Sequence, residues 1–234
     1  MLKMEWIKLI RNNIVALIFG YILLMSLGIN ILAFGFQEVS WVESWLPVFT
    51  IFYIIILIDL LFWMAAMQIS EDMETNMIQV MRTSRTVAHY FFSKHVLLLM
   101  IIVAAAFLAL IPALNQIAFM LQFLFLTLIL SIVMIASGVL LAMIVKKQSV
   151  VMLAGSVVTG FIFAVMIRLV LPMWNIKPVP FNPFEPFIGA YYSLYLPEGP
   201  SAGTYIELTI FAVVFYVISL LIFKKVTFER GFRL

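Results

Sequence analysis

The feature that most constrains the fold is a run of 29 residues, 117–145, that contains no charged side chain. As an α-helix this run is about 44 Å long, which exceeds the roughly 30 Å hydrocarbon core of a bilayer. Further apolar runs recur along the chain, at 14–36, 46–69, 96–114, 150–171 and 205–223. Because a chain inside lipid must satisfy its own backbone hydrogen bonds, such runs favour helices. We therefore predict an all-α integral membrane protein with six transmembrane helices.

The composition agrees with this class. Apolar residues make up 65% of the chain and charged residues 11%, against about 45–50% and about 25% in soluble domains. Six spans leave no room for a sizeable soluble domain, so residues 1–234 are predicted to form a single transmembrane domain. The chain has no cysteine, which excludes disulfides and thiolate metal sites.

The basic residues predict the orientation of the spans. Twelve of the 14 fall in segments that the six spans place on one side of the membrane, and by the positive-inside rule that side is cytoplasmic. They are Lys3, Lys8, Arg11, Arg82, Arg85, Lys94, Lys146, Lys147, Lys224, Lys225, Arg230 and Arg233. Both termini are therefore predicted to be cytoplasmic. Because these residues lie in short clusters beside apolar runs, the net charge of +3 does not indicate a nucleic-acid partner.

The first 13 residues are too polar to cross a bilayer. At about 100° per residue, apolar side chains such as Trp6 gather on one side and charged ones such as Lys8 on the other. This pattern predicts an amphipathic helix lying in the membrane interface, with Trp6 as its anchor. The alternative is a charged leader that only orients the first span.

A charged island at 71–94 separates the second span from the third and holds six of the 25 charged side chains. Ser70 is a suitable N-cap, and acidic residues follow it in what would be a first turn. The Thr-Ser-Arg-Thr segment at 83–86 should end that helix, and residues 87–94 should begin the next one. The island is therefore predicted to contain a short cytoplasmic helix between spans two and three.

The predicted extracellular segment 172–204 contains seven of the nine prolines and many aromatic residues. Asn182 and Pro183 form a good N-cap and first helical position. The apolar run 187–196 is too short to span, which predicts a re-entrant or interfacial helix. Its aromatic residues are candidates for the outer interface, either as a belt that anchors the loop or in contact with a substrate: Phe184, Phe187, Tyr191 and Tyr192.

Asp59 is the one ionisable residue predicted to lie deep in a span. An unpaired carboxylate at that depth costs at least about 2.5 kcal/mol, so it should face protein or water. Two interpretations remain open, a role in a transport pathway and a structural hydrogen bond to a neighbouring helix. Arg168 lies about three residues from the outer end of the fifth span, roughly 12 Å from Asp59 in depth, and is expected to reach the outer face.

Small residues in the fifth span are spaced for close helix packing. Gly155 pairs with Thr159, and Ser156 pairs with Gly160, in each case four residues apart. The two histidines, His89 and His95, lie six residues apart with no other ligand cluster nearby, so no metal site is predicted. No catalytic group is predicted either.

This arrangement resembles the permease subunit of a type-2 ATP-binding-cassette (ABC) transporter. The island carries the local likeness: acidic residues at Glu71 and Glu74, an apolar stretch at 77–81, a Thr-Ser pair at 83–84 and a lysine at Lys94. It departs from the commoner form of this loop, which has a glycine where Thr75-Asn76 stands. The resemblance implies that the island docks on a separate ATPase subunit, through Glu71, Asp72, Glu74, Met77, Met81, Arg82 and Arg85.

The resemblance also implies the assembly. Two ATPase subunits would serve two permease halves, identical or related, which meet at their first and fifth spans. The chain has no Gly-x-x-x-x-Gly-Lys-Ser/Thr phosphate loop, so ATP and Mg²⁺ would bind the partner and this chain is not itself expected to be an enzyme. The expected function is export of a hydrophobic or amphipathic peptide, antibiotic or lipid across a prokaryotic plasma membrane.

Two alternatives come from other functional classes. An ion-coupled secondary carrier would use Asp59 as its proton or cation site, and it would need further paired polar groups or broken helices near mid-membrane. A non-transporting scaffold or immunity protein would bind a toxic peptide without moving it. Transport without ATP would favour the carrier, and binding without transport would favour the scaffold.

Overall fold

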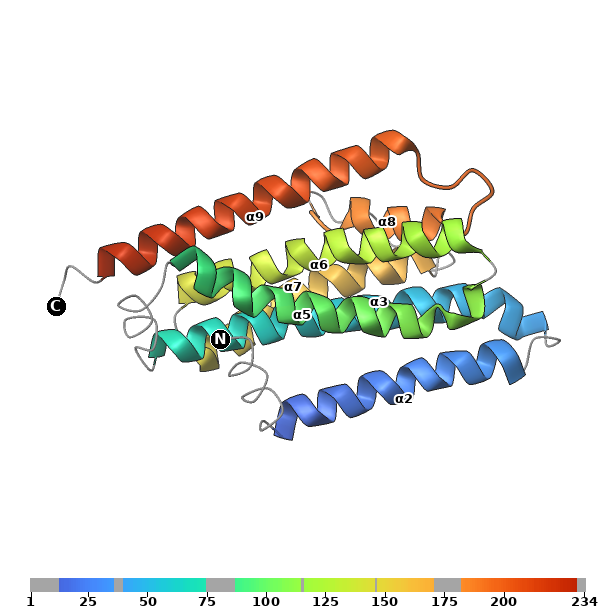
Figure 1. The fold of residues 1–234 in the computed structure, drawn as a ribbon, viewed down its shortest axis with the longest axis horizontal. Coiled ribbons are helices and arrows are strands. Elements are labelled where there is room, and N and C mark those ends of the chain that lie inside the picture. The colour runs from blue at the N-terminus through green and yellow to red at the C-terminus, as the bar shows by residue number, and fades with distance from the viewer. Residues whose placement is uncertain are drawn as a thin grey trace.

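The computed structural model describes residues 13–35, 40–74, 87–114, 116–145, 147–170 and 182–230. Over these ranges every regular element is a helix and no strand occurs. The long helices run side by side as a bundle (Figure 1). In chain order the elements are α2 (Asn13–Gly35), α3 (Ser40–Glu74), α5 (Val87–Ala109), the 3₁₀ turn η1 (Ile111–Ala113), α6 (Ile117–Val145), α7 (Gln148–Val170), α8 (Glu185–Ser193) and α9 (Ala202–Arg230).

Four helices in the described ranges are long and apolar enough to cross a membrane. The qualifying segments are Val48–Glu74, Ile117–Val145, Gln148–Val165 and Ala202–Val226. Two further apolar helical segments, Leu24–Gly35 and His95–Ala109, are shorter. The prediction of an all-helical, multi-pass membrane protein is confirmed at this level. The count of six spans and the cytoplasmic placement of the termini stay predictions.

The centre of the bundle is the contact between α3 and α6. Gly138 of α6 lies against the α3 backbone so closely that a Cβ atom there would be 2.5 Å from the carbonyl oxygen of Phe62 and 3.3 Å from the Cβ of Ala65. Only a residue without a side chain permits this approach. Ala65 and Ala66, both buried, provide the matching flat surface on α3.

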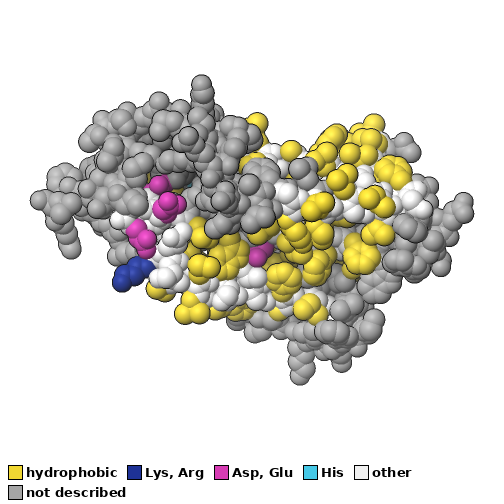
Figure 2. Space-filling view, turned by 90° about the horizontal axis from the view of Figure 1, so that it is seen from below, with side chains coloured by type: hydrophobic (Ala, Val, Ile, Leu, Met, Phe, Trp, Pro, Cys, Tyr) yellow, Lys and Arg dark blue, Asp and Glu magenta, His cyan; other side chains and the backbone are white. Residues whose placement is uncertain are grey.

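The helices around this centre carry apolar side chains on the outside. Leu153 of α7 is 74% exposed, Ile210 of α9 is 58% exposed and Leu24 of α2 is 70% exposed. Figure 2 shows that apolar side chains cover much of the described part of one face, with most of the charged side chains toward one end and one acidic side chain among the apolar ones. An apolar surface of this extent requires lipid or a partner protein to cover it.

The helix boundaries confirm some of the sequence predictions. Helix α6 has the predicted ends, Ile117 and Val145, and α7 covers almost the predicted fifth span. The predicted third span is divided between α5 and η1, because Pro112 at the start of the 3₁₀ turn cannot continue the α-helical hydrogen bonding. Helix α9 extends to Arg230, seven residues beyond the predicted end of the sixth span.

The prediction of a new helix capped by Ser70 is wrong. Ser70 is fully buried inside α3, and its hydroxyl donates to the carbonyl of Met67 at 3.0 Å. The acidic residues that were assigned to a first turn lie instead in the last turn of α3, which ends at Glu74. The second span therefore continues without a break into the charged island.

Helix α8 packs into the bundle. Phe187 and Tyr191 are buried, and the Tyr191 hydroxyl donates to the Thr127 hydroxyl of α6 at 2.8 Å. Phe184, just before the helix, is also buried, whereas Tyr192 is 37% exposed. Three of the four aromatic residues predicted for the outer interface therefore fill space inside the bundle, and Tyr192 is the exposed one.

The start of α8 also differs from the prediction. The helix begins at Glu185, two residues after the predicted first position, Pro183. The Asn182 side chain nevertheless orders this turn: its Oδ1 accepts the backbone N–H of Phe184 at 3.0 Å, and its Nδ2 donates to the carbonyl of Phe161 in α7 at 2.9 Å. Asn182 therefore joins the start of α8 to α7.

Candidate functional site

Asp59 lies on α3 with 8% of its surface exposed. Its carboxylate accepts a hydrogen bond from the Thr159 hydroxyl of α7, at 2.9 Å to Oδ1 and 3.2 Å to Oδ2. No positively charged side chain in the described part of the chain pairs with it. The predicted hydrogen bond to a neighbouring helix is thus present, and its partner is the small polar residue of the Gly155–Thr159 pair.

Trp63 extends this contact to a third residue. Its indole N–H donates to the Thr159 hydroxyl oxygen at 3.1 Å, so Thr159 accepts from Trp63 and donates to Asp59. The Trp63 ring lies on Gly155, where an added Cβ would approach the ring to 2.6 Å. The glycine therefore makes room for the indole, and the threonine one turn later receives its N–H group.

The two small-residue pairs of α7 have different environments. Gly155 and Thr159 face α3 through Trp63 and Asp59. Gly160 has open space around the position of a Cβ. Ser156 is exposed, and its hydroxyl bonds only within α7, to the carbonyl of Leu153 at 2.6 Å. The first pair is an internal packing site, and the second lies on the outer surface of the bundle.

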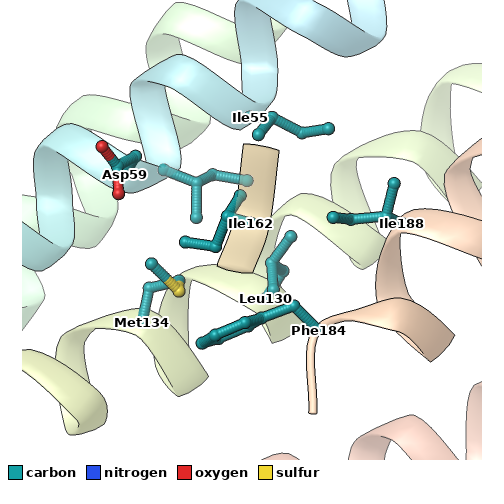
Figure 3. A pocket seen from close by; sticks show the side chains of 8 residues that line it. Ile55, Asp59, Leu130, Met134, Ile162, Phe184 and Ile188 are labelled. Carbon is teal, nitrogen blue, oxygen red and sulfur yellow. The ribbon is translucent and has the colours of Figure 1, made fainter. Parts of the chain in front are cut away.

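A small cavity of about 10 Å³ lies beside Asp59, which is about the space for one water molecule. Figure 3 shows its lining, which consists of apolar side chains from α3, α6, α7 and the start of α8, with Asp59 at its edge. Besides Asp59, the lining residues are Ile55, Ile58, Leu130, Met134, Ile162, Phe184 and Ile188. Apart from Asp59, the described lining has no polar side chain, so the cavity lacks the oxygen ligands that a metal cation needs.

A second polar contact between α3 and α7 lies at the end of α3. The Glu74 carboxylate accepts the backbone N–H of Gln148, the first residue of α7, at 2.8 Å. The N-terminal N–H groups of a helix have no partner within the helix, and a carboxylate placed there also interacts favourably with the positive end of the helix dipole. Of the neighbouring acidic residues, Glu71 is exposed and Asp72 is buried.

The other candidate residues of the island cannot be placed. Met77, Met81, Arg82 and Arg85 lie outside the described residues, as do residues 1–12 of the interfacial helix predicted at 1–13, and the side chain of Arg168 is not described either. Within the described ranges no group of three or more histidine and acidic side chains is arranged to hold a metal ion.

Sequence reasoning missed Trp63 and Gln148. A signal for Trp63 was present, because Asp59 and Trp63 are four residues apart and so share a helix face, as Gly155 and Thr159 do on α7. Two matched pairs of this kind predict a contact between the helices that carry them. No signal could have identified Gln148, because its contribution is a backbone N–H group.

These features define the class as a multi-pass helical membrane protein with two polar contacts between α3 and α7. The chain matches no protein-family model, no curated protein and no solved structure.

Proposed function

We propose that this chain is the transmembrane subunit of an ABC exporter, driven by ATP hydrolysis in a separate ATPase subunit. The observation that carries the proposal is the Glu74–Gln148 hydrogen bond. It ties the first residues of the charged island to a second helix, so a partner that moves the island would move α3 and α7 together. An ordinary connecting loop between two spans has no need of such a link.

The length of α3 supports this mechanism. Its 35 residues correspond to about 52 Å of continuous helix, which reaches from the island through the bundle. A displacement at Glu74 would therefore be transmitted along α3 to the Asp59–Thr159 contact without a flexible joint. Closure of an ATPase pair beneath the island would act on the bundle through this helix.

The exposed face of α7 suits the second permease half. Ser156 and Gly160 lie there among exposed apolar side chains, including Leu153 and Val157, and small residues allow two helices to approach closely. We propose that an identical or related six-span chain packs against this face and α2. The cargo would be a hydrophobic or amphipathic peptide, antibiotic or lipid, exported across a prokaryotic plasma membrane.

Co-purification in detergent tests the proposal. The chain is expressed with the ATPase encoded next to it, and the ATP hydrolysis of the purified complex is measured for the wild type and for Glu71→Lys with Glu74→Lys. A matched control reverses two exposed carboxylates near the start of α9, with Glu198→Lys and Glu207→Lys. The first pair should release the ATPase and the second should not.

Two results would contradict the proposal. One is that no ATPase associates with the wild-type chain. The other is that both double variants retain it equally. Melting curves of the variants alone separate a lost docking site from a lost fold, because Glu74 also binds α7.

A second candidate function is an ion-coupled carrier, which the buried carboxylate of Asp59 favours. Its mostly apolar surroundings in the described part of the chain suit a proton rather than a metal cation, which needs several oxygen ligands. The test is transport by the chain alone in vesicles with an imposed pH gradient and no ATP. Uptake that Asp59→Asn abolishes would establish the carrier, and absence of uptake in the wild type would exclude it.

A further inference from the structure

A second, larger cavity lies where η1 connects α5 to α6, and Asp59 is not among its lining residues. Its volume is about 430 Å³, which is within the roughly 300–1,000 Å³ range of small-molecule sites. The walls come from five helical elements and from the turn after α8. Neither the proposed docking of an ATPase on the island nor the proposed role of Asp59 in a carrier makes use of this space.

The lining combines an apolar body with a few polar groups. Ile29, Leu46 and Phe119 contribute apolar walls from α2, α3 and α6. Thr50 and Tyr195 add hydroxyl groups, and Gln116 adds an amide. The Thr50 hydroxyl donates to the carbonyl of Leu46 at 2.9 Å and is hydrogen-bonded to Tyr195. No charged side chain belongs to the described lining. Among the described lining residues a charged ligand would find no oppositely charged partner to offset the hydration it loses, which is unfavourable.

The walls are held in place by contacts that do not depend on a ligand. The Tyr195 and Phe119 rings meet edge to face, with their centroids 5.2 Å apart. Next to the lining residues Ile29 and Ala109, the Asn30 side chain of α2 donates to the carbonyl of Leu108 in α5 at 3.0 Å. A cavity whose walls are fixed in this way is a preformed site, for which binding requires little reordering.

From this lining we propose that the cavity binds an uncharged amphipathic small molecule. Its apolar chain would lie among Ile29, Leu46 and Phe119. A hydroxyl group would donate to the oxygen of Thr50 or Tyr195, and a hydroxyl or ester oxygen would accept from the Gln116 amide. A neutral bilayer lipid and a neutral amphipathic cargo share this chemistry. The inference depends on the membrane environment of the chain and not on an ATPase partner.

The test uses a diazirine-bearing monoacylglycerol as a photoreactive probe on the full chain in detergent. Saturable labelling should map to peptides that line the cavity, and unlabelled monoolein should compete with it. Oleate has the same acyl chain with a carboxylate and should compete poorly. Labelling that is not saturable, maps elsewhere or is displaced equally well by oleate would overturn the proposal.

Two tryptophan variants localise the binding. Ala113→Trp places an indole on the cavity wall and should abolish the saturable labelling. Leu114→Trp places the same indole at the next residue, which is 47% exposed and is not among the described lining residues, and should leave labelling intact. Tyr195→Phe keeps the ring and removes the hydroxyl, so it should weaken competition by monoolein. Equal labelling of all three variants and the wild type would refute the site.

Native mass spectrometry distinguishes the two sources of the ligand. A neutral lipid that co-purifies with the wild type and with Leu114→Trp, but not with Ala113→Trp, identifies a resident bilayer lipid. A wild-type chain that purifies without lipid and then takes up added monoolein identifies a site for an exchangeable cargo. A chain that neither carries lipid nor takes up monoolein contradicts the proposal.

Discussion

Glu74, the last residue of α3, accepts a hydrogen bond from the backbone N–H of Gln148, the first residue of α7. The two residues are 74 positions apart in the sequence. The contact therefore joins the end of α3 to the start of α7, although α5, η1 and α6 lie between them in the chain. It acts as an N-cap supplied by a different helix.

Loss of this contact should destabilise the N-terminus of α7. Replacement of an N-cap acceptor by alanine typically costs about 1 kcal/mol, so Glu74→Ala should lower the melting temperature in detergent. Glu74→Gln retains an acceptor oxygen and should lie close to the wild type. Glu198→Ala removes another exposed carboxylate and serves as the control. A melting temperature for Glu74→Ala equal to that of Glu198→Ala would contradict the cap.

The glycine between α6 and α3 should not tolerate a methyl group. Gly138→Ala would place its Cβ 2.5 Å from the Phe62 carbonyl oxygen, and overpacking of this kind costs about 1–3 kcal/mol. Gly160→Ala has open space for the same atom and should leave the stability of the isolated chain unchanged. Thermal unfolding of both variants tests the pair, and equal stability would be inconsistent with the close α3–α6 contact.

The Thr159 hydroxyl should contribute more to the stability of the folded chain than its methyl group does. Thr159→Val removes the donor to Asp59 and the acceptor for Trp63, and interhelical hydrogen bonds in membranes are worth about 0.6–2 kcal/mol. Thr159→Ser retains both hydrogen bonds and should cost less. If the serine and valine variants unfold at the same temperature, the network does not contribute to stability.

The Tyr191 hydroxyl should contribute to the docking of α8. Tyr191→Phe removes a buried hydrogen bond to Thr127 and should cost about 0.5–1.5 kcal/mol. Tyr192→Phe makes the same chemical change on the exposed neighbour and should have no effect on the melting temperature. Proteolysis near α8 provides an independent measurement. It should be faster than in the wild type for Tyr191→Phe but not for Tyr192→Phe.

The apolar runs predict the helices well, because lipid leaves the backbone few alternatives. The ends of α6 follow from local signals, since polar Asn115 and Gln116 precede it and two lysines follow it. The end of α3 does not follow from local signals. Ser70 followed by three acidic residues is a favourable helix start, yet the buried Ser70 hydroxyl is satisfied within the helix and Glu74 gains a partner on α7. Tertiary contacts thus override the local signal.

The candidate site was predictable in part. A carboxylate in an apolar span predicts a hydrogen-bonding partner, and Asp59 has one. The identity of the partner depends on the register between α3 and α7, which no local pattern specifies. The same limit applies to α8, because an aromatic residue suits a membrane interface and a protein core equally well. The burial of Tyr191 follows from its position opposite Thr127.

The uninterrupted course of α3 places Asp59 and Glu74 on one rigid rod. They are 15 residues apart, which corresponds to about 22 Å along the axis and to about 60° around it, and both bond to α7. A helix held to its neighbour at two points on nearly the same side cannot roll about its own axis without breaking both bonds. Helices α3 and α7 therefore form one rigid unit. Any conformational change must tilt the two helices together or break both hydrogen-bonded contacts.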